Sequence, residues 1–150
     1  KPNWYKKHFF RKSFNFSCNI ISLIDYETVI SWAKQNRKEI EISYMLEPYV
    51  FDSEKEYYKW NDLGMYFIDN YYNNETICEN LVSNIFPNSW SNEYSTVLKK
   101  RVNLFEELKN NSNPIISNIG KIKLKQIMQD IDYYLEKEKS DNEERFNSFE

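Results

Sequence analysis

A recurring pattern of polar and apolar positions runs through the chain, in which an asparagine able to cap a helix precedes apolar residues spaced three or four positions apart. The pattern starts at Asn36, Asn74 and Asn113, so that successive starts are 38 and 39 residues apart. Apolar residues at this spacing form one face of an α-helix, and the asparagine accepts a hydrogen bond from the first turn. A period of this length is typical of tandem pairs of helices that stack on one another.

Local signals divide the chain into predicted helices. Asp25 is an N-cap, Asp52-Ser53 with Glu56 forms a capping box, and Pro114 stands at a first helical position, where its missing N–H costs nothing. Helices are expected at about 25–35, 36–46, 53–72, 74–86, 93–109 and 113–139.

Two stretches alternate as a strand would. Residues 14–20 have no convincing partner strand, so we assign them to an irregular or partly helical arm that packs on the repeats. Residues 40–44 also alternate, and we assign them to a helix because their neighbours are helical. Pro48 ends that helix, since it disfavours helical geometry in the residue before it.

The composition favours helices filled with aromatic rings. The chain has two glycines and four prolines, which leaves little turn chemistry for tight hairpins, and its aromatic content is 17%. We therefore predict an all-α fold of three consecutive antiparallel helical pairs in a short superhelical stack. The expected parts are a basic, aromatic N-terminal arm (1–24), a helical-repeat domain (25–139) and an acidic, charged tail (140–150).

The segment from Asn113 to Leu124 resembles the HEAT-repeat pattern, with a polar residue and proline at its start, a small residue at Gly120 and a leucine four positions later. It departs from the pattern at Ser117, where the repeat often has Arg, and at Gly120, where Ala is usual. The resemblance implies a HEAT- or armadillo-like stack of the three helical pairs.

The order of features from Trp32 to Glu150 resembles the C-terminal helical region of large bacterial multidomain proteins, many of them nucleotide-hydrolysing proteins of antiviral defence. The resemblance implies that catalytic domains lie upstream of this chain, which begins at Lys1 without a methionine, and that this piece packs against or senses something. The features that carry it are Trp32 and Arg37, an aromatic helix pair, Phe86-loop-Trp90-Ser91, Arg101, the Asn113-Pro114 helix and Glu144-Arg145-Phe146.

The sequence offers no constellation for catalysis. His8 is the only histidine, and it lies in the basic arm, far in sequence from any positioned nucleophile. Cys18 and Cys78 lack the spacing of a metal site and are expected to be reduced and buried. Two glycines do not make a phosphate-binding loop. We predict a non-enzymatic protein with no cofactor and no metal.

Charge is distributed unevenly, although the net charge is only −3. Residues 1–14 carry five Lys or Arg and no acid, whereas residues 130–150 carry eight acids and three bases. Short charged termini are most often simply solvated, but a basic arm can also bind nucleic acid. No apolar run is long enough to cross a bilayer, so we expect a cytoplasmic protein with no membrane partner.

Two binding candidates follow. A loop aromatic can anchor a protein partner, which points to Trp90, Ser91 and Asn92, unless the tryptophan faces inward and plugs the end of a helix pair. Bases interleaved with rings can stack on single-stranded nucleic acid, unless this segment simply packs on the repeats. The bases are Lys6, Lys7, Arg11 and Lys12.

We predict a scaffold or protein-recognition module, which is the C-terminal part of a larger bacterial protein of phage defence. Its partner is another protein or the upstream domains of the same polypeptide. The alternative is a nucleic-acid-binding module that uses the basic arm.

Overall fold

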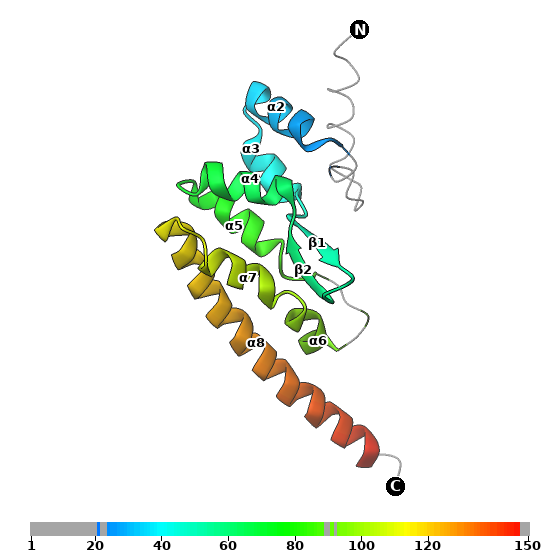
Figure 1. Ribbon diagram of the computed structural model, residues 1–150. Helices are drawn as coiled ribbons and strands as arrows, with labels where there is room; N and C mark the ends of the chain where they lie inside the picture. Colours follow the sequence, from blue (N-terminus) through cyan, green and yellow to red (C-terminus); the bar gives the residue numbers. More distant parts are fainter. Residues whose placement is uncertain (1–20, 22–23, 89–90, 92, 148–150) are drawn as a thin grey trace.

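The computed structural model describes residues 21, 24–88, 91 and 93–147, and side chains up to residue 144. This part of the chain is mostly helical, as predicted, with α2 at one end of the molecule and the C-terminal part of α8 at the other (Figure 1). Apart from Ile21 and Ile24, the predicted arm at 1–24 lies outside the described residues. The elements are α2 (Tyr26–Asn36), α3 (Glu39–Met45), β1 (Tyr49–Asp52), β2 (Tyr57–Trp60), α4 (Asp62–Tyr71), α5 (Glu75–Ser83), α6 (Tyr94–Lys99), α7 (Val102–Lys109) and α8 (Pro114–Asn147).

Side-chain caps set the starts of several helices. Asp25, Asn61 and Asn74 each accept a hydrogen bond from the backbone N–H three residues later, at 3.0, 2.8 and 3.2 Å. Each bond satisfies one of the N–H groups that a helix leaves unpaired at its first turn. The predicted starts after Asp25 and Asn74 are therefore confirmed, and Asn61 is a cap that the sequence reading did not identify.

Helix α3 is helical despite its strand-like alternation, as predicted. Its C-terminal end is held by Asn84, the C-cap residue of α5, whose side-chain amide donates to the backbone oxygens of Ser43 at 3.0 Å, Tyr44 at 3.1 Å and Leu46 at 2.7 Å. These carbonyls have no partner within the helix, so the amide from α5 caps α3 and fixes the two helices together. The alternation of 40–44 was thus overridden by packing.

The predicted helix at 53–72 is wrong over nearly its first half, because α4 begins only at Asp62, and the all-α prediction needs the same correction. Residues 49–60 form an antiparallel hairpin, in which Asp52 pairs with Tyr57. The Asp52 carboxylate accepts from the backbone N–H groups of Glu54 and Lys55, both at 3.2 Å, and Glu56 has a positive φ of 57°. The signal interpreted as a helix cap therefore closes a four-residue turn, in which the left-handed position lacks the usual glycine.

The predicted helix at 93–109 is also corrected, because the structure divides it into α6 and α7 at Lys100 and Arg101. The backbone oxygen of Lys100 accepts from the backbone N–H of Tyr58 at 2.8 Å, and the indole N–H of Trp60 donates to the backbone oxygen of Leu104 at 2.8 Å. The hairpin thus hydrogen-bonds both to the break at Lys100 and to α7 itself at Leu104.

Arg101 is buried at this junction, with 7% of its surface exposed. Its guanidinium lies over the rings of Tyr49 at 4.7 Å and Tyr58 at 5.0 Å and donates to the backbone oxygen of Ile85. Its Nε has no hydrogen-bond partner in the described structure. Burial raises the pKa of Tyr49 to about 12, against the opposing effect of Arg101, so the ring stays neutral. The hairpin, α5 and α7 meet at this one cation, which also stacks on the aromatic faces.

Helix α8 packs along α7 and α6, and its C-terminal part projects away from the other elements (Figure 1). It approaches α7 closely at Gly120, where a Cβ atom would lie 2.2 Å from the backbone nitrogen of Lys109. Ile116, Ile127 and Ile131 of α8 are buried, whereas Leu135 is 39% exposed. The helix continues past residue 139 through 147, so the described part of the charged tail extends α8.

A carboxylate from α8 caps α6. Glu138 accepts from the backbone N–H of Ser95 at 3.0 Å and from its hydroxyl at 2.6 Å, and Ser95 is completely buried. Desolvation acts to raise the pKa of Glu138, but the hydrogen bonds from Ser95 outweigh it and leave the pKa below its ordinary value of 4.5. Since a lowered folded-state pKa stabilises the fold above the unfolded-state pKa, this stabilisation is lost as the pH falls through the folded-state value.

Replacing Glu138 with Gln is expected to lower the free energy of unfolding at pH 7 by about 1 kcal/mol, the usual cost of removing a cap. The difference from the wild-type chain should shrink as the pH falls below 4.5, because the wild-type carboxyl is then protonated as well. Urea unfolding at several pH values measures it, with Glu136→Gln, an exposed position on the same helix, as the control. A Glu138→Gln difference that does not change with pH would contradict the capping role.

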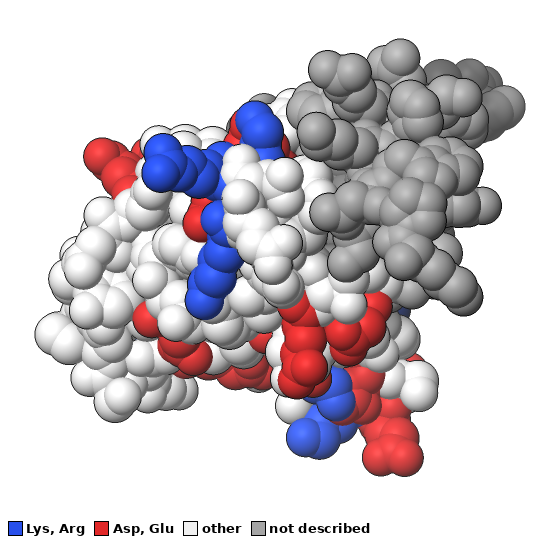
Figure 2. Space-filling view, turned by 90° about the horizontal axis from the view of Figure 1, so that it is seen from above, with Lys and Arg blue, Asp and Glu red and all other residues white. Residues whose placement is uncertain are grey.

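Charges of both signs are scattered over the face seen from above, separated by uncharged surface (Figure 2). The described residues form no extended basic patch on this face. An extended basic surface is the usual electrostatic signature of nucleic-acid binding. The nucleic-acid alternative rests on Lys6, Lys7, Arg11 and Lys12, which lie outside the described residues, so this face does not test it.

Candidate binding groove between α5 and α8

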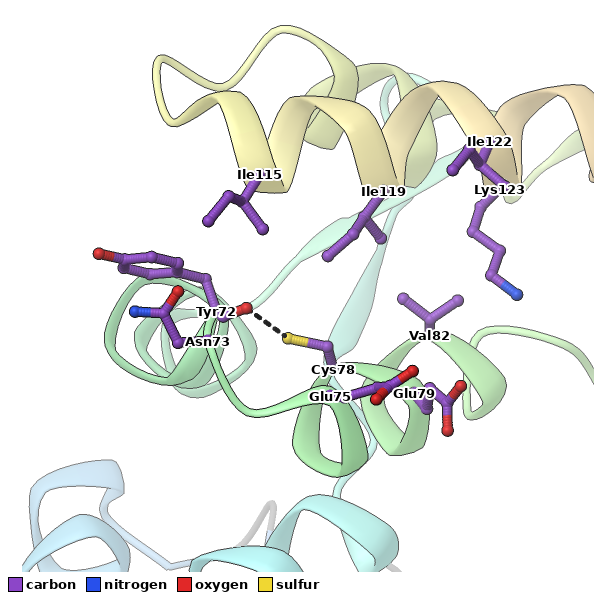
Figure 3. Close-up of a pocket in the computed structure, with 10 residues that line it drawn as sticks. All are labelled: Tyr72, Asn73, Glu75, Cys78, Glu79, Val82, Ile115, Ile119, Ile122 and Lys123. Carbon is purple, nitrogen blue, oxygen red and sulfur yellow. Dashed lines mark hydrogen bonds between the residues drawn. The ribbon is translucent and has the colours of Figure 1, made fainter.

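A groove separates α5 from the N-terminal half of α8 (Figure 3). Its volume is about 480 Å³, within the range of pockets that hold ligands. Helix α8 forms one wall and α5 forms the other, while the residues that follow α4 close one end. The lining residues are Tyr72, Asn73, Glu75, Cys78, Glu79, Val82, Ile115, Ile119, Ile122 and Lys123.

The wall from α8 is a stripe of three isoleucines. Asn113 accepts a hydrogen bond from the backbone N–H of Ile115 at 2.9 Å, which begins the helix at Pro114. Ile115, Ile119 and Ile122 follow at spacings of four and three, so their side chains share one face and point toward α5 (Figure 3). Ile115 is 45% exposed and Ile122 is 58% exposed. Two large apolar side chains are thus left open to solvent beside a hollow.

This stripe differs from the seam that holds α8 to α7. Ile116 and Gly120, both buried, lie on the face that packs against α7, roughly a quarter turn or more from the isoleucine stripe. The isoleucine stripe was not predicted from the sequence. The signal was present, because isoleucines at 115, 119 and 122 repeat at helical spacing beside a seam that already fills one face.

The wall from α5 combines a buried floor with an acidic edge. Cys78 is 5% exposed, and its thiol donates to the backbone oxygens of Tyr71 at 3.5 Å and Tyr72 at 3.6 Å. Burial raises the pKa of the Cys78 thiol, so it is protonated at neutral pH and acts as an apolar contact rather than as a nucleophile. Beside it, Glu75 and Glu79 lie one helical turn apart at the edge of the groove (Figure 3).

The charged groups of the groove lie on opposite walls. Neither Glu75 nor Glu79 forms a salt bridge with any residue that the structure describes. On α8, the ammonium of Lys123 donates to the side-chain oxygen of Gln126 at 3.3 Å. The groove is therefore apolar at its centre, acidic along α5 and basic at one point on α8.

The two sites predicted from the sequence are not brought to this groove by any described contact. Trp90 and Asn92 lie outside the described residues, as do the four bases of the N-terminal arm. Ser91 is exposed in the segment between α5 and α6. The Trp90 loop and the arm therefore stay predictions.

Among the described residues, no group of three or more His, Cys, Asp or Glu side chains is placed to hold a metal ion. None of the described helices is both long enough and apolar enough to cross a membrane.

Comparison with protein-family models finds no match, and neither do comparisons with curated proteins and with solved structures. The groove therefore has to be interpreted from its own geometry, and the resemblance to HEAT-like regions of defence proteins stays a prediction.

Proposed function

We propose that this chain is a non-enzymatic, cytoplasmic helical scaffold that recognises a protein partner through the α5–α8 groove. The observation that carries this proposal is the isoleucine stripe of α8, whose Ile115 and Ile122 stay exposed because a groove separates the stripe from α5. Helix-lined apolar grooves commonly bind amphipathic segments of other proteins, whose apolar anchors supply most of the binding energy.

The order of the elements supports a HEAT-like stack as part of the same proposal. Helices α2 and α3 pack together, as do α4 and α5, and α7 and α8. The resemblance to the C-terminal regions of bacterial antiviral-defence proteins suggests the setting, in which this chain is the recognition part of a longer polypeptide in phage defence. Its partner is then a separate protein or the upstream domains.

Selection of 16-residue random peptides displayed on phage against the 150-residue chain tests the proposal. Selected peptides should bind the wild-type chain and lose affinity by about tenfold or more when Ile122 becomes Gln, because one apolar anchor contact is removed. Met128→Gln is the matched control, since Met128 lies on another face of the same helix and is 44% exposed. Fluorescence anisotropy with labelled peptides measures both.

Equal affinity of the selected peptides for the wild-type chain and for Ile122→Gln would reject the groove as the recognition site. So would an equal loss in Met128→Gln, because general damage to α8 would then explain the effect. Failure to select any binding peptide would also count against the proposal.

A further inference from the structure

The charge distribution of the groove restricts what can fill it. Glu75 and Glu79 border the apolar floor, and a ligand that covers the groove removes water from both carboxylates. Desolvation of a carboxylate is costly unless a cation or a hydrogen-bond donor replaces the lost water. Since the described structure provides no salt-bridge partner for either group, a ligand that supplies cations there fits the groove best.

The walls of the groove restrict the backbone conformation of a peptide ligand. Both walls are helices, whose backbone groups are already hydrogen-bonded, so an extended peptide finds no strand edge to extend there. The isoleucine stripe from Ile115 to Ile122 is about 10 Å long, which is about two turns of an α-helix. A helix with apolar residues at matching spacing would lie along it.

The position of Lys123 sets an orientation. It lies on α8, across the groove from the acidic edge of α5 (Figure 3). Positive charge along the α8 side of a ligand would therefore be repelled, whereas positive charge along the α5 side would face Glu75 and Glu79. The groove thus favours a ligand with different charges on the two sides of its apolar face.

We propose that the occupant is an amphipathic helix of a partner protein, with its apolar stripe against the isoleucines of α8 and lysines or arginines beside Glu75 and Glu79. This inference rests on the proposed function and adds the chemistry of the partner. The bases replace the water lost by the two carboxylates, and the helix covers the exposed surface of Ile115 and Ile122.

Two synthetic helical peptides with the same leucine stripe test this inference. One carries lysines and the other glutamates at the positions that flank one side of the stripe. The lysine peptide should bind the wild-type chain at least about tenfold more tightly at low ionic strength, where charge interactions are least screened. The double variant Glu75→Lys/Glu79→Lys should reverse this order.

The matched control is Glu143→Lys/Glu144→Lys, which makes the same change of net charge at exposed positions on the projecting end of α8. It should keep the preference of the wild-type chain for the lysine peptide. Circular dichroism melting of both double variants checks that each is folded.

The inference is overturned if the two peptides bind the wild-type chain equally, if Glu75→Lys/Glu79→Lys keeps the preference, or if neither peptide binds. Its failure is distinguishable from failure of the proposed function. Phage-selected peptides that depend on Ile122 but have no basic flank would overturn only the charge and leave the groove as a recognition site. A small apolar molecule that displaces the selected peptides from the groove, without any contribution from basic side chains, would also overturn only the charge and leave the groove as a recognition site.

Discussion

Replacing Arg101 with alanine is expected to lower the free energy of unfolding by about 3 kcal/mol, because it leaves a cavity and a buried carbonyl without its donor. The side chain fills the space between the rings of Tyr49 and Tyr58 and donates to the backbone oxygen of Ile85. It is the point at which the hairpin, α5 and α7 are held together. Urea unfolding followed by circular dichroism measures the change.

Two variants show whether the geometry of the guanidinium matters. Lysine at position 101 keeps the charge but loses the planar group that stacks on the rings, so its loss should be smaller than that of alanine and still measurable. Lys100→Ala, at the exposed neighbouring position, should change stability by only about 0.5 kcal/mol. An Arg101→Ala variant as stable as Lys100→Ala would show that the junction does not depend on this cation.

Replacing Gly120 with alanine should destabilise the chain by about 2 kcal/mol, although alanine is the better helix former by about 1 kcal/mol. A methyl group at this position would lie 2.2 Å from the backbone nitrogen of Lys109 and 2.6 Å from the carbonyl carbon of Leu108. Backbone atoms cannot turn aside as a side chain can, so α8 has to move away from α7. Thermal and urea unfolding measure the loss.

Asn118→Ala is the control for this prediction, because Asn118 is an exposed position two residues earlier in the same helix. It should leave stability unchanged or raise it slightly through helix propensity. The HEAT-repeat pattern usually has alanine at the position of Gly120. A Gly120→Ala variant more stable than the wild-type chain would therefore mean that α7 and α8 sit farther apart, as they would with alanine between them.

Capping residues predicted local structure well where a helix start was the only structure that their side chains could stabilise. Asn74 and Asp25 start helices as expected, but Asn36 is the last residue of α2 and does not cap α3, which begins at Glu39. Asp52 failed, because a carboxylate that accepts from backbone N–H groups two and three residues later fits a tight turn as well as a helix start. The choice between them was made by packing of the aromatic residues on both sides of the turn, and Trp60 of β2 bonds to Leu104, 44 residues away. A local motif does not carry that information.

The break at Arg101 shows the same limit. The apolar spacing from 93 to 109 fits one continuous helix, and no glycine or proline interrupts it. The interruption arises because the backbone oxygen of Lys100 accepts a hydrogen bond from Tyr58 and the side chain of Arg101 turns inward toward the hairpin. Since the hairpin itself was not predicted, its effect on the later helix was not predictable either.

The groove could not be predicted from the sequence either, because it arises from long-range packing. The isoleucines at 115, 119 and 122 were readable as a second apolar stripe, but a second stripe on a long helix can equally be buried under a neighbour. What leaves it open is that α8 packs on α6 and α7, while α5 packs on α3 and α4. The spacing predicts which residues share a face, and the tertiary structure decides whether that face is covered.

Nuclear magnetic resonance of methyl groups, with a phage-selected peptide titrated into the wild-type chain, tests most directly whether the groove is the recognition site. We expect shifts in the methyl signals of Ile115, Ile119, Ile122 and Val82, which line the groove, with little change at Ile40 and Met128. A peptide that binds and leaves the four groove residues unshifted would contradict the account and place recognition elsewhere on the chain.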